Sequence, residues 1–227
     1  MKSVEEGTMR GDAITRMCPS AAVVTAVIMG LGWHLLVVAG QAPPGKTSEW
    51  NFDKEPVGRA PARATVFSGN WAVRAEAGAP SPPNALCQTG VAEFPALSLS
   101  ESVYTDATVE ASFKPISGHE DQAAGIIFRI QDKDNYYIAR ANALEDNLNI
   151  YKFIHGRRIF IKGANAKVSS NKWQQLGVEV TGSRIRGSLN GQPLVEASDD
   201  TFRAGKIGLW TKADSVTCFD NIRVTTR

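Results

Sequence analysis

Polar and aromatic side chains recur at alternate positions in short apolar segments of the second half of the chain. Residues 136–142 read YYIARAN, so Tyr136, Arg140 and Asn142 share one face of a predicted strand. Arg within an apolar strand is seldom buried unless it is paired, and its planar guanidinium suits recognition of polar groups. Sugars present apolar C–H faces and hydroxyl edges, so an aromatic ring beside Arg and Asn predicts a carbohydrate-binding surface.

Neighbouring segments extend this predicted surface. Arg129 shares a face with Ile127, Asn149 shares one with Tyr151, and Trp210 alternates with Leu209 before Lys212. If these strands pair in sequence order, the side chains line one concave sheet. The alternative for the aromatic members is core packing. The predicted carbohydrate-binding residues are Arg129, Tyr136, Arg140, Asn142, Asn149, Tyr151, Trp210 and Lys212.

Acidic residues that are close in sequence are candidates for a second chemistry, because glycosidases use two carboxyl groups for acid–base catalysis. The closest acidic pairs are Glu120-Asp121, Glu145-Asp146 and Asp199-Asp200. Adjacent strand residues point to opposite faces, so a solvated turn explains each pair more simply. Glu145 and Asp146 are retained as weak catalytic candidates because they lie between two strands with polar residues on a common face. The sequence contains no Ser nucleophile elbow and no phosphate-binding glycine motif.

Two residue pairs far apart in sequence are candidates for contacts across a folded domain. Asp53 lies near the start of the body of the chain and Asp220 near its end, and terminal strands of sandwiches are often neighbours. Their carboxylates predict a structural calcium site, whereas the alternative is that Asp220 accepts backbone hydrogen bonds. Cys87 and Cys218 form a disulfide in one interpretation and are two separate buried side chains in the other.

These residues must be positioned by short strands, because hydrophobic residues recur with period 2 and turn residues interrupt them every 8–12 positions. Asn190-Gly191 predicts a tight hairpin, since both residues tolerate positive φ. In residues 123–131, Ile126, Phe128 and Ile130 are predicted to share one face. The residues expected to be buried between two sheets are Phe128, Leu148, Ile150, Leu176, Val178, Ile185, Leu189, Ile207, Leu209 and Ile222.

Composition excludes several classes of protein. The 227 residues carry 25 Lys and Arg against 23 Asp and Glu, and a net charge of +2 does not predict a nucleic-acid partner. Hydrophobic residues make up 43%, which is typical of a globular domain. The glycines and prolines follow no regular period, which excludes collagen.

The N-terminal segment predicts export. Residues 21–38 are apolar, Lys2, Arg10 and Arg16 precede them, and Gly40 and Ala42 occupy the −3 and −1 positions of a signal-peptidase site. We therefore assign residues 1–42 to a signal helix, 43–49 to a linker and 50–227 to one domain, in a periplasmic or secreted protein. The alternative is an uncleaved anchor, which would be the protein's one contact with a membrane.

Several segments resemble the 3-keto-disaccharide hydrolase domain family. They are GIIFRIQDKDNYYIARANALEDN (125–147), LNGQPL (189–194), GKIGLWTKADSVTCFDNIRV (205–224), WNFDKEPVG (50–58), SGNWAV (68–73) and SPPNALCQT (81–89). The resemblance implies an all-β fold, a two-sheet antiparallel jelly-roll sandwich of the concanavalin A-like type. This agrees with the strand pattern of the sequence.

The resemblance leaves three functions open. Glucanases of this fold carry two Glu and an Asp alternating on one strand, and this sequence has no Glu-x-Asp-x-Glu run. The first function is a lectin-like module that binds carbohydrate. The second is a glycoside-active enzyme, a hydrolase or lyase of the 3-keto-disaccharide type. The third is a structural interaction domain of the cell envelope.

Overall fold

A computed structural model of the protein describes residues 45–226, and every regular element in this range is a β-strand. The strands are β1 (Thr47–Trp50), β2 (Thr65–Ser68), β3 (Trp71–Ala75), β4 (Asn84–Gln88), β5 (Ala96–Ser98), β6 (Ala107–Ser117), β7 (Ala123–Asp132), β8 (Asn135–Asn142), β9 (Asn147–Ile154), β10 (Arg157–Asn165), β11 (Gln174–Thr181), β12 (Arg184–Leu189), β13 (Gln192–Ser198), β14 (Lys206–Trp210) and β15 (Val216–Thr226). No helix in the described range is long and apolar enough to cross a membrane.

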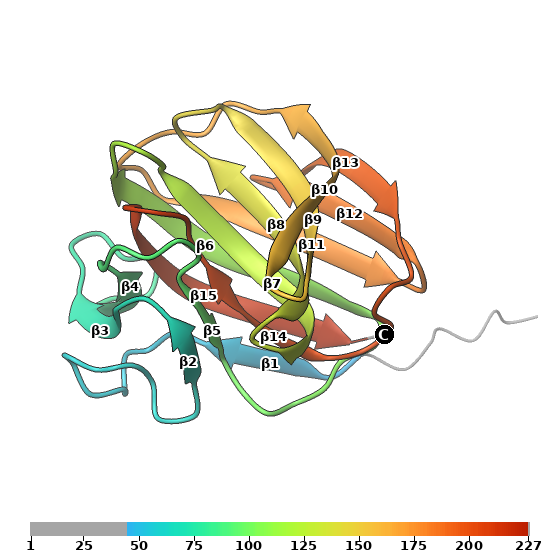
Figure 1. Ribbon diagram of the computed structural model, residues 1–227. Coiled ribbons are helices and arrows are strands. Elements are labelled where there is room, and N and C mark those ends of the chain that lie inside the picture. Colours follow the sequence, from blue (N-terminus) through green and yellow to red (C-terminus); the bar gives the residue numbers. More distant parts are fainter. Residues whose placement is uncertain (1–44, 227) are drawn as a thin grey trace, which may run out of the picture. The chain divides into compact units, whose positions relative to one another are not determined.

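The strands form two stacked antiparallel sheets (Figure 1). The eight-stranded sheet has the order β13-β12-β11-β6-β15-β4-β3, with β1 paired to β15. The seven-stranded sheet has the order β10-β9-β8-β7-β14-β5-β2. The predicted all-β sandwich is confirmed.

The hydrophobic core lies between the two sheets. It contains all ten residues predicted to be buried there, from Phe128 on β7 to Ile222 on β15. Cross-strand pairs such as Leu176–Leu189 and Val180–Ile185 place these side chains on a common inner face. The period-2 pattern of the sequence therefore identified the core correctly.

The Asn190-Gly191 turn joins β12 to β13 with φ values of 51° and 77°. These are the positive values that a two-residue hairpin turn requires. The Asn190 side chain also accepts a hydrogen bond of 2.9 Å from the Gln175 backbone N–H, which ties the turn to β11.

The domain begins earlier than the sequence predicted. β1 starts at Thr47, within the predicted linker 43–49, and pairs Thr47 with Thr225 through Trp50 with Ile222. The alternation that defines a strand was too short here to be recognised. The predicted signal helix 1–42 and the cleavage after Ala42 lie outside the described residues.

Strand β7 contains a bulge near its end. Arg129 has φ of 49°, and the register with β8 shifts between Phe128 and Asp132. Ile130 consequently lies with Ile127 on the outer face and not with Phe128 in the core, as the strict alternation predicted. Gly205 faces the bulge, where a Cβ would lie 2.3 Å from the carbonyl carbon of Arg129.

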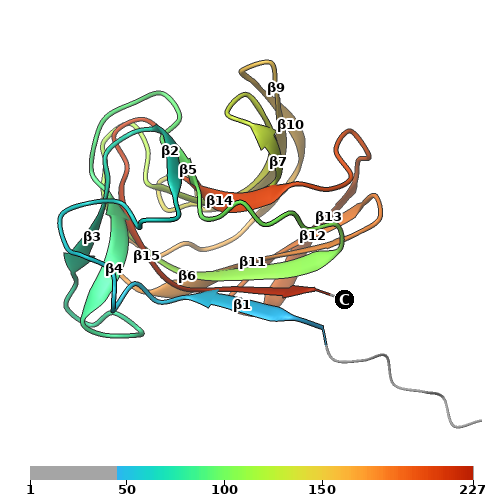
Figure 2. The ribbon, with the colours of Figure 1, turned by 90° about the horizontal axis from the view of Figure 1, so that it is seen from below.

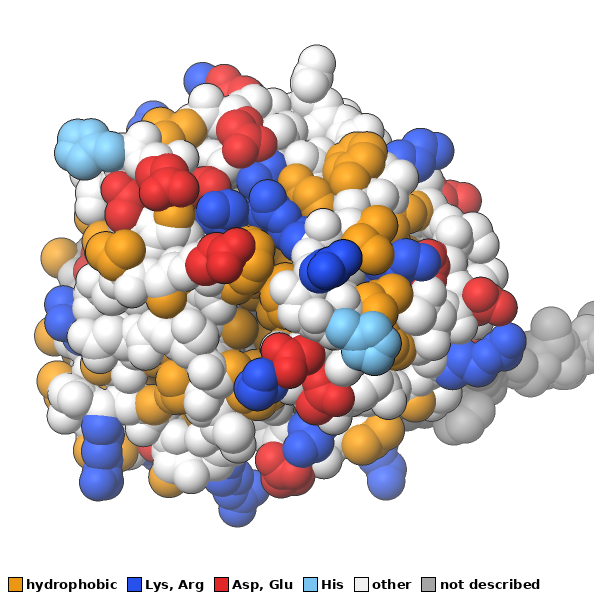
Figure 3. Space-filling view, in the orientation of Figure 1, with side chains coloured by type: hydrophobic (Ala, Val, Ile, Leu, Met, Phe, Trp, Pro, Cys, Tyr) orange, Lys and Arg blue, Asp and Glu red, His pale blue; other side chains and the backbone are white. Residues whose placement is uncertain are grey.

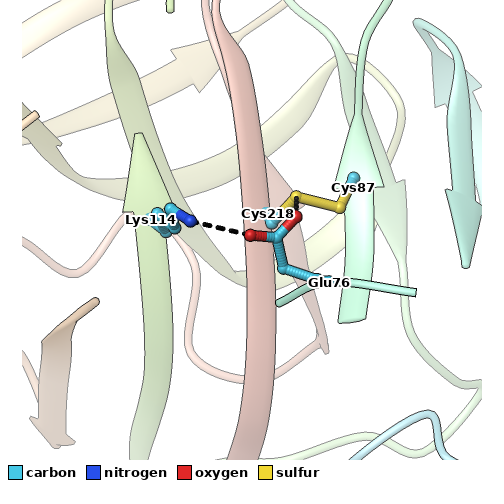
Figure 4. Close-up of a disulfide and its surroundings, with 4 residues drawn as sticks. All are labelled: Glu76, Cys87, Lys114 and Cys218. Atoms are coloured by element: carbon cyan, nitrogen blue, oxygen red, sulfur yellow. Dashed lines mark hydrogen bonds and ion pairs between the residues drawn. A yellow bond between two sulfur atoms is a disulfide. The ribbon is translucent and has the colours of Figure 1, made fainter. Parts of the chain in front are cut away.

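Cys87 and Cys218 are bonded in a disulfide between the adjacent strands β4 and β15 (Figure 4). The two residues are directly paired across the strands, with Cα atoms 4.0 Å apart. Glu76 lies beside the bond and forms a 2.7 Å ion pair with Lys114. The structure therefore contains the predicted disulfide and not the alternative of two separate buried cysteines.

Candidate functional site

The outer face of the seven-stranded sheet is concave. β14 crosses the base of the concavity, while β9 and β10 on one side and β2 and β5 on the other rise beyond it (Figure 2). Figure 3 views this face and shows basic and acidic side chains around a hollow with hydrophobic walls. The solvated face of an antiparallel sheet is normally polar, so a hollow on this face with apolar walls and aromatic rings indicates a binding surface.

The strand register places one row of predicted site residues side by side. Asn149 pairs with Arg140, Arg140 with Gly125, and Gly125 with Trp210 across β9, β8, β7 and β14. A Cβ at Gly125 would approach the Trp210 ring to 3.1 Å, so the glycine makes room for the indole. Pairing in sequence order, the condition set by the sequence, holds for β7, β8 and β9, whereas β14 pairs with β7 from a distant part of the chain. The register brings Arg140 and Trp210 onto the same face.

Arg140 is the centre of a polar network. Its guanidinium is 1% exposed and bonds Glu145 at 2.6 Å and Asn147 at 2.8 Å. The Asn149 amide, oriented to satisfy its neighbours, accepts from Arg140 at 3.1 Å and from the Tyr151 hydroxyl at 2.9 Å. The hydrogen bond from Arg140 lowers the pKa of Glu145. Glu145 is therefore ionised at neutral pH and holds Arg140 in place.

Asp121 joins this network from the segment before β7. It accepts a hydrogen bond from the Asn142 amide and is 5% exposed. Burial raises the pKa of Asp121, and the charge of Arg140 opposes that rise. The sequence pattern indicated Asp121 only as part of a solvated acidic turn. The signal that it missed is the register, because Ala123 pairs with Asn142 and Asp121 precedes it by two positions.

Arg158 on β10 is the second residue of this site that sequence reasoning missed. The central carbon of its guanidinium lies 4.8 Å from the centre of the Tyr151 ring, 5.5 Å from Phe94 and 5.9 Å from Trp210. Stacking on several rings holds a guanidinium by cation–π attraction. The available signal was that Arg158 and Phe160 are two positions apart on one strand, so both side chains point to the same face.

Two buried N–H donors in this region have no hydrogen-bond partner among the described residues. They belong to Arg140 Nε and Arg158 Nη1, whereas the Trp210 indole hydrogen-bonds the Tyr136 hydroxyl. Both guanidiniums lie within 5.5 Å of the Tyr151 ring, and that of Arg158 lies 5.9 Å from Trp210. An unpaired buried donor is unfavourable by about 1–3 kcal/mol, so two beside one ring mark a place where a ligand supplies acceptors.

The aromatic side chains divide into a base and a rim. Trp210 and Tyr136 are 0% and 1% exposed, so they form the base of the hollow and do not offer free stacking surfaces. Phe160 is 59% exposed and packs edge-on against Tyr151. Lys212 lies 5.6 Å from the Phe94 ring and 3.9 Å from Glu120. We call the following residues the polar cluster: Asp121, Arg140, Asn142, Glu145, Arg158 and Lys212.

Arg129 does not belong to this site, contrary to the sequence prediction. The bulge in β7 turns its side chain away, and the guanidinium bonds the backbone oxygens of Phe202, Thr105 and Gly182 at 2.8–3.2 Å. Asp106 lies 3.6 Å away. Burial lowers the pKa of Arg129, and its three carbonyl partners give it a structural role.

The side chains of Glu145 and Asp146 have different partners and do not face each other. Glu145 faces Arg140, whereas Asp146 bonds Lys167 at 2.8 Å and the Val168 backbone N–H at 3.0 Å. The positive φ of 49° at Asp146 turns the chain between them. Only Glu145 lies in the polar cluster.

Asp53 and Asp220 lie close together, as predicted for terminal segments of a sandwich. Ser81 bridges them, with its hydroxyl 2.7 Å from Asp53 and its backbone N–H 2.7 Å from Asp220. Asn84 and Asn221 donate to the remaining carboxylate oxygens. These donors satisfy the carboxylates within the protein, and calcium binding by the pair stays a prediction.

Known proteins similar to this chain place the site in context. The chain is 27% identical over 162 residues to a levanase of Bacillus subtilis (strain 168), and the match spans 70% of this chain and 22% of the levanase. The carbohydrate-binding module CBM66 from Bacillus subtilis is 24% identical, with a TM-score of 0.62 over 72% of this chain and 95% of the module. A Bacillus licheniformis β-glucanase is 11% identical, with a TM-score of 0.54 over 81% of this chain and 99% of the glucanase.

The two structures share the jelly-roll sandwich of this protein. A family model described as the 3-keto-alpha-glucoside-1,2-lyase-like domain matches residues 48–225, which include every described strand except the first residue of β1 and the last of β15. The match contains the whole concave face and its polar cluster. The chain therefore belongs to the family of 3-keto-alpha-glucoside-1,2-lyase-like domains.

Proposed function

We propose that the protein is a lectin-like module that binds a carbohydrate at the polar cluster on its concave face. The observation that carries this proposal is the pair of buried, unpartnered donors on Arg140 and Arg158, which both lie within 5.5 Å of the Tyr151 ring. The similarity to the CBM66 module and to the levanase supports it.

Sugar hydroxyls match this set of groups because each hydroxyl both donates and accepts. The free donors of Arg140 and Arg158 would bond hydroxyl oxygens, and the carboxylates of Asp121 and Glu145 would accept hydrogen bonds from sugar hydroxyls. Arg158 is fixed by its three rings, so little side-chain freedom would be lost on binding.

A glycan array that contains levan and other plant and bacterial polysaccharides tests this function directly. Calorimetric titration of the best ligand should then show that Arg158→Ala weakens binding about tenfold or more, or roughly 1.4 kcal/mol. Arg157→Ala is the matched control, because Arg157 is exposed, precedes Arg158 on β10 and points to the opposite face. Equal affinities of the two variants, or no glycan bound on the array, would contradict the proposal.

A second function, elimination from a 3-keto-glucoside, is favoured by Asp121 together with the family. In such a substrate the proton at C2 is acidic because it lies next to the C3 ketone. A carboxylate that takes this proton allows the C1–O bond to break, and the leaving oxygen then takes up a proton. Burial raises the pKa of Asp121, which lies beside the charges of Arg140 and Arg158, and a carboxylate with a raised pKa is a stronger base for this step.

Incubation of the protein with a 3-keto-glucoside, followed by NMR, distinguishes the two functions. Lyase activity predicts an unsaturated keto sugar and a free aglycone, both lost in Asp121→Asn and retained in Asp146→Asn. A protein that binds glycans but leaves this substrate intact is a binding module only.

We also propose that the protein functions outside the cytoplasm. The apolar N-terminal segment with its cleavage-like residues and the Cys87–Cys218 disulfide support this location, because disulfides persist in oxidising compartments. Fractionation of cells that express the tagged protein, with mass spectrometry of its N-terminus, tests export and cleavage after Ala42.

A further inference from the structure

A hollow lies on the concave face, beside the polar cluster. Its volume is about 270 Å³, just below the roughly 300–1,000 Å³ typical of small-molecule sites. Four aromatic side chains form its walls, and we call it the aromatic pocket. They are Phe67, Phe94, Tyr136 and Phe153.

The walls of the aromatic pocket are ordered by ring contacts. Tyr136 stacks on Phe153 with centroids 4.8 Å apart, and Phe94 meets Phe153 edge-on at 5.2 Å. These rings come from β8, β9 and the segment before β5, so three separate parts of the sheet converge on the pocket. Tyr136 and Phe153 are buried and support the walls from behind, so the half-buried Phe67 and Phe94 provide the accessible apolar surface of the pocket.

The rim of the aromatic pocket is charged. Glu93, Lys133 and Asp134 line it, and Lys133 bonds Asp134 at 2.6 Å. A sugar ring suits such a pocket, because its C–H faces can pack on the apolar walls and its hydroxyl groups can bond the carboxylates and the ammonium group of the rim. A purely hydrocarbon ligand would leave this rim without new partners.

Phe94 connects the aromatic pocket to the polar cluster. The Phe94 side chain lines the aromatic pocket. The guanidinium of Arg158 and the ammonium of Lys212 lie 5.5 and 5.6 Å from the centre of its ring. Phe153, another wall, is the cross-strand partner of Arg158. The two sites therefore adjoin along one face and share the Phe94–Arg158 contact.

We propose that the aromatic pocket is a second sugar subsite, which takes the neighbouring unit of an oligosaccharide whose first unit lies at the polar cluster. This inference rests on the proposed carbohydrate-binding function. It implies that the protein prefers chains of two or more units to the corresponding monosaccharide.

Calorimetric titration of the purified protein with two series of saccharides tests the second subsite. The probes are fructose through levantetraose and glucose through maltotetraose, which cover the linkage suggested by the levanase and a glucoside. Affinity in the series that binds should rise about tenfold or more from one unit to two, because the second ring buries apolar area in the pocket.

Two variants remove the pocket by opposite means. Phe67→Ala deletes a wall, and Ser68→Trp fills the hollow, since Ser68 lines it from the edge strand β2. Both should reduce the affinity for the longer saccharides to that of the monosaccharide and leave monosaccharide affinity unchanged. Val66→Trp is the control, because Val66 is 42% exposed on the same strand and does not line the pocket.

The outcomes separate the two proposals. Affinity that does not change with chain length, or that both pocket variants leave intact, overturns the second subsite while the polar cluster stands as a single-sugar site. Absence of binding in both series, together with an empty glycan array, overturns the proposed function and the subsite with it. Circular dichroism of each variant verifies that the fold is retained.

Discussion

Arg140 and Arg129 are both almost fully buried, with 1% and 3% of their surfaces exposed, but their partners differ. Arg140 bonds side chains of the site, namely Glu145, Asn147 and Asn149. Arg129 bonds three backbone oxygens at the edge of the sandwich. Side-chain partners near a hollow suit a ligand, whereas backbone partners stabilise the fold.

Arg140→Ala should therefore leave the protein folded and weaken glycan binding about tenfold or more, or roughly 1.4 kcal/mol. Arg129→Ala should instead lower the free energy of unfolding by about 3 kcal/mol, because three carbonyls lose a charged donor, and leave affinity unchanged. Urea denaturation and calorimetric titration measure the two effects. An Arg140→Ala protein that unfolds would assign Arg140 a structural role.

Asp220 predicts a pH dependence of stability. Burial and the nearby Asp53 raise its pKa from 3.8 to about 6. The unfolded chain ionises first as the pH rises, so stabilisation from protonated Asp220 is complete below pH 3.8 and is lost by about pH 6. This loss should amount to about 2–3 kcal/mol. Urea denaturation between pH 3.5 and 7, relative to Asp220→Asn, should show it, and parallel profiles of the two proteins would exclude it.

Calcium at Asp53 and Asp220 makes a separate prediction. A bound Ca²⁺ would neutralise two adjacent carboxylates. Addition of Ca²⁺ to the EDTA-treated protein at pH 7 should therefore raise its melting temperature, and a later excess of EDTA should reverse the rise. Thermal denaturation measures this effect, with Asp220→Asn as the control that should not respond. An unchanged melting temperature of the wild-type protein would remove calcium from this pair.

At the scale of the elements, the bulge in β7 decides which side chains reach the concave face. It places Ile130 on that face and Arg129 away from it, and it requires a glycine at position 205. A Cβ there would lie 2.3 Å from the carbonyl carbon of Arg129 and 2.6 Å from the Ile130 nitrogen. Backbone atoms cannot yield as a flexible side chain does.

Gly205→Ala should accordingly lower the free energy of unfolding by about 3 kcal/mol through overpacking. Gly191→Ala is the comparison, because nothing lies within 4 Å of its Cβ position and only its φ of 77° is unfavourable. That variant should lose about 1 kcal/mol. Chemical denaturation ranks the two variants, and equal losses would mean that the bulge adapts to a side chain.

At the scale of the whole molecule, the candidate binding sites and the disulfide lie on different sheets. The seven-stranded sheet carries the polar cluster and the aromatic pocket on its outer face. The eight-stranded sheet carries the disulfide, which packs with Ala85, Ile116 and Trp173. The Cys87–Cys218 bond spans a sequence separation of 131 residues, so it restricts the unfolded chain strongly.

Replacement of both cysteines by alanine should lower the free energy of unfolding by about 2–5 kcal/mol and leave glycan affinity within about twofold. Guanidinium denaturation and calorimetric titration of the double variant measure these quantities. A large loss of affinity in a folded double variant would show that the two sheets are coupled.

The sequence by itself determined the fold class, the core and part of the site. Period-2 alternation is a local property, so it identified the strands, the ten core residues and the shared face of Tyr136, Arg140 and Asn142. The family motifs in residues 50–224 led to the same sandwich. Each of these conclusions depends on neighbouring residues or on short segments alone.

Only the tertiary structure decided which residues complete the site. The bulge at Arg129 turns that side chain away from the concave face, because a single extra residue reverses the faces of the strand that follows. No local sequence pattern predicts such a bulge. Asp121 and Arg158 enter the site through cross-strand register, and the aromatic pocket forms from Phe67, Phe94 and Phe153, which are distant in sequence. Contacts between remote segments depend on how the sheet pairs and curves, and alternation within one strand does not encode them.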